Sequence, residues 1–179
     1  QLLKLTAREY GLEVNSSIDE RYNLEKATQA ACKYLRKSYE KFGSWTMAAA
    51  AYNMGQNGLM RSVQKQSANN YYNLHLNAET RQYIFRILAV KEILENPKYF
   101  GFIYRNKDLY SMPEYEFIEI DSTISDLYVF ASSHGVNYKI LKEFNPWLLR
   151  SVLPDESRKK YKIKLPVNKD SLIFDNIVK

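Results

Sequence analysis

The sequence predicts a mainly α-helical fold that ends in a small domain of two strands and two helices. Apolar residues recur at helical spacing through much of residues 24–95. No segment before Phe102 alternates as a strand does, whereas the later segments EYEFIEI and KYKIKLP alternate charged and apolar residues. A chain of 179 residues, 45% hydrophobic and 26% charged, has the composition of a globular protein with one or two domains.

Two helices are expected before residue 55. Leu24–Phe42 has helical apolar spacing, with Asn23 placed to cap its start and Gly43 just past its end. Trp45–Tyr52 is rich in alanine, whose small side chain lets neighbouring helices approach closely. We therefore expect this second helix at the centre of the first domain.

Two more helices follow in the same domain. One covers about residues 56–66, and the other, Ala78–Glu95, begins after a capping Asn77 and stops before Pro97. The apolar stripe of the longer helix is expected to pack against the core. Its members are Tyr83, Ile84, Ile87, Leu88, Val90 and Ile93.

The second domain reads as strand, helix, helix, strand. Glu114–Ile120 and Lys160–Pro166 are the two strands, expected to pair antiparallel. Between them, Ile124–Ser133 and Tyr138–Phe144 read as helices. We assign the domains by residue number: 1–104 helical domain, 105–114 linker, 115–167 second domain, 168–179 C-terminal tail.

Composition excludes several kinds of function. The single Cys32 cannot form an internal disulfide, and His75 and His134 lack the spacing of metal ligands, so we expect no metal and no other cofactor. The net charge is +6, and residues 1–102 hold 14 Lys and Arg against 9 Asp and Glu. These basic residues are dispersed and no nucleic-acid motif accompanies them, so no nucleic acid is expected as a partner. No apolar run of about 18 residues is present and no signal segment opens the chain, so no transmembrane segment is expected.

The stretch AAAAYNMGQNG, residues 48–58, is the strongest functional candidate. A tyrosine and an asparagine at the end of a buried helix offer a flat ring for a sugar together with directed hydrogen bonds. The spacing fits a purely structural role equally well: Tyr52 in the core, Asn53 as a C-terminal cap and Gly55 as a helix stop. Physical reasoning from this stretch leaves both roles open.

The same stretch resembles the AYNxG motif of the lytic transglycosylase domain, the SLT domain, whose core is similar to goose-type lysozyme. Four other segments agree in order. They are LTAREYGLEVN, DERYNLEKATQAACKYL, FGSW and LNAETRQYI. Together they resemble the membrane-bound lytic murein transglycosylase D group over about the first 100 residues. The resemblance implies a lysozyme-like all-α domain whose first helix begins before Gln1, so that the domain is N-terminally truncated in this chain.

The second domain is similar to the lysin motif (LysM), a βααβ module that binds N-acetylglucosamine polymers. The family's opening after its first strand appears here as residues 120–123, and Asn145 followed by Pro146 matches the family's asparagine. Residues 149–158 form a longer segment than the module usually has. The domain therefore resembles a divergent member, either glycan-binding or mainly structural.

The resemblance implies an activity. These enzymes cleave the β-1,4 bond between N-acetylmuramic acid and N-acetylglucosamine without water and leave a 1,6-anhydro end, using one carboxylic acid. The family carries that glutamate in a Glu-Ser motif upstream of a Gly-Leu-x-Gln motif, whose glutamine corresponds to Gln1. We therefore expect no catalytic residue within this chain, which would then be inactive alone. Glu79 is expected to support the glycan cleft and not to replace the acid, because a general acid must reach the glycosidic oxygen.

Carried over from the family, the substrate-binding residues are Gln1, Tyr52, Asn53, Glu79 and Tyr83. Tyr52 would orient the acid or the acetamido group of the substrate, and Asn53 would hold the helix end or the sugar. Glu79 and Tyr83 would shape a neighbouring subsite. The partner implied is the peptidoglycan glycan strand, and the implied location is the periplasm or the outer membrane. The alternative is a non-catalytic protein that binds peptidoglycan through both domains.

Overall fold

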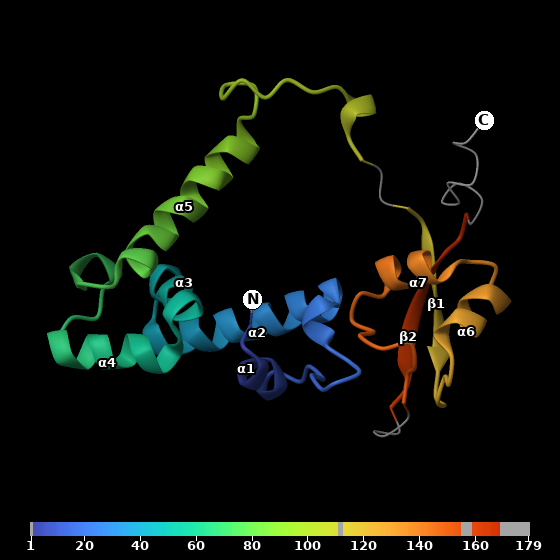
Figure 1. Ribbon diagram of the computed structural model, residues 1–179. Helices are drawn as coiled ribbons and strands as arrows, with labels where there is room; N and C mark the ends of the chain where they lie inside the picture. The colour runs from blue at the N-terminus through green and yellow to red at the C-terminus, as the bar shows by residue number, and fades with distance from the viewer. Residues whose placement is uncertain (1, 111–112, 155–158, 169–179) are drawn as a thin grey trace. The chain divides into compact units, whose positions relative to one another are not determined.

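Figure 1 shows the computed structural model, which describes residues 2–110, 113–154 and 159–168. Contacts divide the chain into two compact units: residues 31–110, and residues 1–30 together with residues 111–179. The boundary falls inside the long helix α2, Leu24–Phe42. The domain boundaries expected at residues 104, 114 and 167 remain predictions, because a unit defined by contacts need not coincide with a family domain.

The unit of residues 31–110 is helical throughout its regular structure, as the sequence predicts. Besides the second part of α2 it contains three α-helices and two short 3-10 helices. They are α3 (Trp45–Met54), α4 (Gln56–Gln66), η2 (Tyr71–Asn73), α5 (Ala78–Glu95) and η3 (Asn106–Asp108). The caps expected for the two long helices are confirmed. Asn23 accepts a hydrogen bond from the Lys26 amide at 3.0 Å, and Asn77 accepts one from the Thr80 amide at 2.9 Å.

Helix α3 lies at the centre of this unit, which confirms the expectation drawn from its alanines. It contacts α4, α5 and η2. Its buried residues are small apart from one methionine: Met47, Ala48, Ala50 and Ala51. Gly55, with φ +85°, then turns the chain directly into α4, a conformation that only glycine adopts at little cost.

The apolar stripe expected on α5 is only partly buried. Ile84 is 6% exposed and packs with the α3 core, but Ile87, Leu88 and Val90 are 45%, 51% and 54% exposed. Within the described residues, this helix therefore carries an apolar face that the unit of residues 31–110 leaves open.

The other unit begins with helix α1, Lys4–Glu9. Leu3 is extended, with φ −64° and ψ 154°, so α1 does not continue a helix from before Gln1. The helix expected to begin before Gln1 lies outside the described residues. Leu3 has no side chain that could cap a helix, so the sequence carries no start signal at this position.

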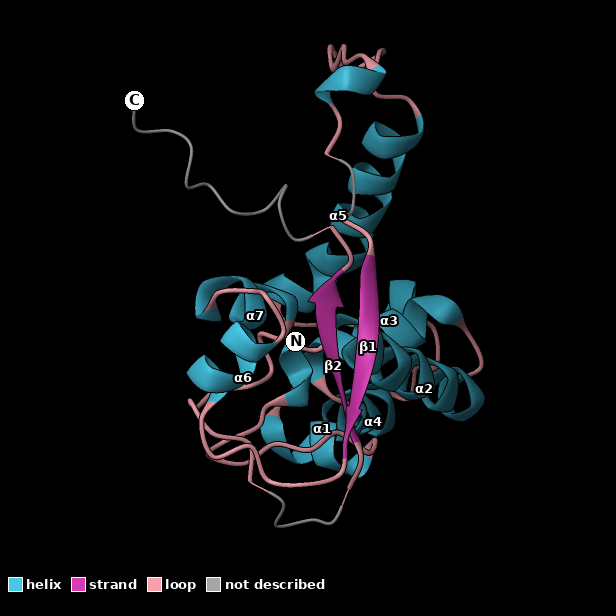
Figure 2. Ribbon diagram, turned by 90° about the vertical axis from the view of Figure 1, so that its right-hand side faces the viewer, coloured by secondary structure: helices cyan, strands magenta, loops and turns pink. Residues whose placement is uncertain are grey.

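The remaining elements of this unit are β1 (Tyr115–Ile120), α6 (Leu127–Ser133), α7 (Tyr138–Phe144) and β2 (Tyr161–Pro166), the order that the sequence predicts. The strands pair antiparallel, with Ile118 opposite Ile163 (Figure 2). Helix α6 starts three residues later than expected. Ile124 is held in an isolated bridge with Leu153, and Asp126 caps the helix by accepting from the Tyr128 amide.

The core of this unit includes a residue from the N-terminal part of the chain. Ile18 is 1% exposed and belongs to the same buried cluster as Leu141, Ile163 and Leu165. The backbone around Ile18 forms an antiparallel bridge with Leu148. The strand-helix-helix-strand fold is therefore completed by a segment of the chain about 100 residues upstream of it.

Polar contacts also join this upstream segment to the strand-helix-helix-strand domain. The Tyr161 hydroxyl donates to a Glu13 carboxylate oxygen at 3.1 Å, and Lys159 pairs with the same oxygen at 3.2 Å. Within the upstream segment, the Arg21 guanidinium donates a bidentate hydrogen bond to the carboxylate of the buried Asp19. This bond holds the pKa of Asp19 below its usual value. Of the helices within the described ranges, none is long and apolar enough to cross a membrane.

Candidate functional site

An open groove of about 510 Å³ runs between α2, α3 and α5 in the unit of residues 31–110. Its lining is apolar except for a threonine and two tyrosine hydroxyls. The residues that decide its character are Leu35, Trp45, Tyr52, Tyr83, Ile87 and Leu88. The groove therefore lies between the end of α3, where Tyr52 begins the YNMG segment (residues 52–55), and the open apolar face of α5.

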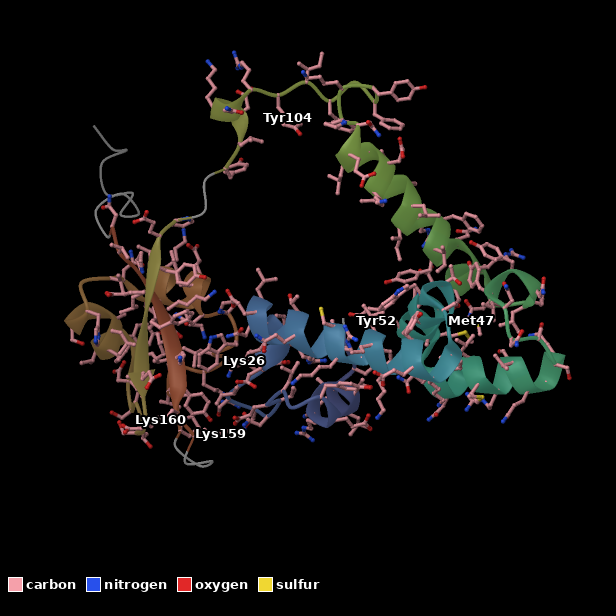
Figure 3. The ribbon with its side chains drawn as sticks, turned by 180° about the vertical axis from the view of Figure 1, so that it is seen from behind. Lys26, Met47, Tyr52, Tyr104, Lys159 and Lys160 are labelled. Carbon is pink, nitrogen blue, oxygen red and sulfur yellow. The ribbon has the colours of Figure 1, made fainter. Side chains whose placement is uncertain are left out.

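Tyr52 lies at the last turn of α3 and is half-buried (Figure 3). Its ring packs edge-on against the ring of Tyr34, with centroids 5.6 Å apart. The Tyr34 hydroxyl in turn donates to the Ala51 carbonyl at 2.9 Å and accepts from the Gln56 amide at 3.1 Å. This hydroxyl satisfies groups at the end of α3 and at the start of α4, so it fixes the position of Tyr52.

A second pair of hydrogen bonds links the turn between α3 and α4 to α2. The Gln56 side-chain amide donates to the Ser38 hydroxyl at 2.8 Å, and that hydroxyl donates to the Tyr34 carbonyl at 2.8 Å. Ser38 is fully buried. Buried polar groups that are all satisfied rigidify their surroundings, so this end of the groove is preorganised.

Asn53 takes a role that the sequence did not suggest. Its side-chain oxygen accepts a hydrogen bond from the Thr80 hydroxyl at 2.7 Å, which links the end of α3 to the first turn of α5. The C-cap of α3 is Gly55 and not Asn53. Asn53 is also absent from the groove lining, so the structure does not bring its side chain together with Tyr52 and Tyr83.

Tyr83 lines the groove from α5, and Glu79 lies one turn before it on the same helix. Burial raises the pKa of Tyr83, and the nearby Tyr52 and Glu79 raise it further. Glu79 itself is exposed and forms an ion pair with Arg86 at 3.0 Å. Of the five residues expected from the sequence, the structure thus places Tyr52 and Tyr83 in one groove with Glu79 near Tyr83, while Gln1 lies outside the described residues.

Of the lining residues that the sequence did not indicate as site candidates, two stand next to each other at the start of α3. Trp45 and Thr46 form the first turn of α3, and Trp45 remains 58% exposed while packing on Tyr39 at 4.5 Å. A signal was available, because Trp45 belongs to the FGSW segment that carries part of the family resemblance. Ser44 caps the helix through the Met47 amide, so the aromatic ring is left at the groove.

The groove can hold a ligand but its lining offers no acid. None of the lining residues is a carboxylic acid, and the exposed Glu79, outside the lining, pairs with Arg86 at 3.0 Å. Tyrosine rings can stack on a sugar, and their hydroxyls can bind its polar groups. In the part of the chain that the structure describes, no group of three or more His, Cys, Asp or Glu side chains is placed to hold a metal ion.

Comparison with protein families now adds to this geometry. Residues 1–75 match the family described as Transglycosylase SLT domain. Residues 116–169 match the Soluble lytic transglycosylase C-terminal LysM-like domain. Residues 1–75 therefore resemble an SLT domain, and residues 116–169 resemble a LysM-like domain. Tyr52 and Asn53 fall inside the SLT match, whereas Glu79 and Tyr83 lie just beyond its last residue.

Two curated relatives agree with this assignment. Both are named Membrane-bound lytic murein transglycosylase D, one from Escherichia coli K12 and one from Escherichia coli O6:H1. Each is 32% identical over 106 residues, covering 56% of this chain. The chain spans only 24% of the length of these relatives. The resemblances to an SLT domain and to a LysM-like domain are therefore confirmed, and so is the fold class.

Proposed function

We propose that this chain is part of a peptidoglycan lytic transglycosylase that cleaves the β-1,4 bond between N-acetylmuramic acid and N-acetylglucosamine. The observation that carries the proposal is that Tyr52, the first residue of the YNMG segment, and Tyr83 line the same preorganised groove. The product is a 1,6-anhydro end, formed during turnover of the cell wall. The site of action is the periplasm or the outer-membrane surface.

The chemistry needs a single carboxylic acid. It protonates the glycosidic oxygen as that bond breaks, and the resulting carboxylate takes the proton from the 6-hydroxyl of muramic acid. The 6-hydroxyl oxygen then bonds to the anomeric carbon in place of water. We place this acid on the Glu-Ser motif that precedes, in the family, the glutamine corresponding to Gln1. Glu79 is exposed and does not line the groove, which favours a supporting role for it.

The residues of this chain bind and orient in this proposal. The Tyr52 hydroxyl, on a backbone fixed through Tyr34, directs the acid or the acetamido group of the substrate. Tyr83 supplies a second hydroxyl, which like any tyrosine is protonated at neutral pH, and burial raises its pKa further. Asn53 contributes by locking α3 to α5 through Thr80.

The proposal is tested with purified sacculi and mass spectrometry of the released fragments. The present chain is compared with a protein extended upstream through the Glu-Ser motif, and with the same extended protein carrying glutamine for the motif's glutamate. We expect 1,6-anhydromuropeptides only from the unaltered extended protein. If the extended protein releases none while still sedimenting with sacculi, the non-catalytic peptidoglycan-binding function replaces this proposal.

Tyr52→Phe removes one hydroxyl and keeps the ring. In the extended protein we expect anhydromuropeptide release to fall by about fivefold to tenfold, the size of one lost hydrogen bond to substrate. The melting temperature should stay within about 2 °C of the parent, because the stacking on Tyr34 is retained. Tyr72→Phe, at an exposed tyrosine outside the groove, is the matched control. Equal losses of stability and of activity in Tyr52→Phe would contradict the proposed role.

A further inference from the structure

A second pocket, of about 270 Å³, lies entirely within the unit of residues 1–30 and 111–179. Its walls come from two parts of the sequence. Tyr22 and Leu24 belong to the segment matched by the SLT family, whereas Phe144 and Lys164 belong to the LysM-like match. Tyr115, just before that match, completes the aromatic wall. Neither family segment forms this pocket by itself.

Paired backbone holds the two walls together. The Asp19 amide donates to the Trp147 carbonyl at 2.9 Å, and the Leu149 amide donates to the Ser17 carbonyl at 2.9 Å. Between them, the buried Ile18 anchors the segment in the core of the LysM-like domain. The pocket is therefore built on main-chain hydrogen bonds and a buried side chain, and not on a contact between exposed side chains alone.

The pocket keeps apolar surface open to solvent. Tyr22 is 51% and Leu24 is 65% exposed, and Tyr115 and Phe144 are half-buried. Exposed aromatic faces of this kind stack well on the apolar face of a sugar ring, or on the methyl group of an acetamide. A volume near the lower end of ligand pockets suits one or two sugar rings.

The rim of the pocket is polar but carries little net charge. Lys164 forms an ion pair with Glu25 and lies over the Tyr115 ring, 4.5 Å from its centroid. The ion pair with Lys164 lowers the pKa of Glu25, so the carboxylate stays ionised. Glu143, also at the rim, lies 3.7 Å from Lys139. Such a rim can donate and accept hydrogen bonds from neutral hydroxyls, whereas a polyanion would need an excess of positive charge.

Many backbone groups in the loops of the LysM-like domain are hydrogen-bonded within the chain. Ile124 and Leu153 exchange two hydrogen bonds of 2.9 Å, and the Leu127 amide donates to the Ser151 carbonyl at 2.8 Å. Leu149 is paired with Ser17. The paired amides of these loops are not free to donate to a ligand, which favours the aromatic pocket as the place where this domain meets a glycan.

We propose that the pocket between Tyr22, Tyr115 and Phe144 is a second glycan site, which binds a short stretch of an N-acetylated amino-sugar chain. Only the choice of sugar rests on the proposed function; the site itself is separate from the Tyr52 groove. The SLT segment and the LysM-like domain then bind the glycan jointly, and the LysM-like domain is not a separate module on a tether.

The test is a titration of the full chain with N-acetylglucosamine tetramer, followed by calorimetry and by amide chemical shifts. We expect shifts to concentrate at residues 22–25 and 143–147. Tyr22→Ala should weaken binding by about tenfold, the effect of removing one stacked ring, with an unchanged melting temperature. Tyr128→Ala is the matched control, because Tyr128 is 54% exposed in the same unit but lies outside the pocket.

The outcomes separate this inference from the proposed function. Failure of the chain to bind the tetramer would overturn the second site, and so would binding that Tyr52→Phe weakens and Tyr22→Ala does not. Release of anhydromuropeptides by the extended protein would leave the proposed function intact in either case. Binding lost in Tyr22→Ala and kept in Tyr52→Phe and Tyr128→Ala supports the second site, even if the extended protein proves inactive.

Discussion

Replacing Ile18 with aspartate is expected to unfold the LysM-like domain, although Ile18 lies in the segment matched by the SLT family. The side chain is 1% exposed and packs in the same cluster as Leu141, Ile163 and Leu165. The substitution removes a buried aliphatic group and places a carboxylate without a partner in the core. We expect a loss of at least about 4 kcal/mol in the free energy of unfolding. A domain of about 50 residues is rarely stable enough to withstand such a loss.

Hydrogen exchange measured by mass spectrometry on the full chain gives a local readout. Peptides covering β1 and β2 should lose their protection in Ile18→Asp. Val129→Asp makes the same kind of change on the same unit, at a side chain that is 65% exposed in the first turn of α6. It should leave the protection unchanged. Retained protection of β1 and β2 in Ile18→Asp would mean that the domain folds without the upstream segment.

The part of the fold that the sequence predicts well is encoded locally. Helices α2, α5 and α7 have the expected bounds, and Asn23, Asn77 and Asn137 each accept a hydrogen bond from a backbone amide three residues later, although only the first two caps were expected. Such signals need no knowledge of the rest of the chain. The start of α6 was placed wrongly for the opposite reason: Ile124 is kept out of the helix by Leu153, a partner that no local pattern reveals.

The candidate site shows the same limit. Tyr52 and Tyr83 were named through the family resemblance, and the groove places them together. The bond between Asn53 and Thr80 joins residues 27 positions apart, so the sequence could offer only a cap or a sugar contact for Asn53. The apolar stripe on α5 was read correctly as apolar, but periodicity cannot say which of its members a neighbouring element will cover.

The pairing of the SLT segment with the LysM-like domain is the least predictable feature. Residues 13–25 contain no strand signal, and their bridge partner, Leu148, lies in an irregular loop. Burial of Ile18 and the bonds of Glu13 to Tyr161 and Lys159 emerge only when both segments are folded. A family boundary drawn from sequence therefore divides what the structure packs as one unit.

Asn145→Ala is expected to destabilise the same unit by about 2–4 kcal/mol. Asn145 is fully buried and bonds with both of its side-chain polar atoms. Its amide nitrogen donates to the carbonyls of Leu141 at 2.9 Å and of Lys164 at 2.8 Å, and its oxygen accepts from the Lys164 amide at 2.8 Å. One side chain thus joins the end of α7 to β2. Truncation leaves buried backbone groups without partners and opens a cavity.

Asn145→Asp separates the loss of donors from the loss of volume. A carboxylate has nearly the same size as the amide but cannot donate to the Leu141 and Lys164 carbonyls, and it carries a charge into the core. We expect this variant to be at least as unstable as Asn145→Ala at pH 7. The difference between the two should shrink as the pH falls, because a protonated carboxyl group regains one donor.

Urea unfolding of the full chain measures these effects, and Asn96→Ala is the matched control. Asn96 is likewise the C-cap of a helix, α5, but it is exposed and its side chain bonds only within that helix, to Glu92 at 2.8 Å. Its replacement should change the free energy of unfolding by no more than about 0.5 kcal/mol. Equal effects at Asn145 and Asn96 would show that capping accounts for both, and that the link from α7 to β2 adds no stability of its own.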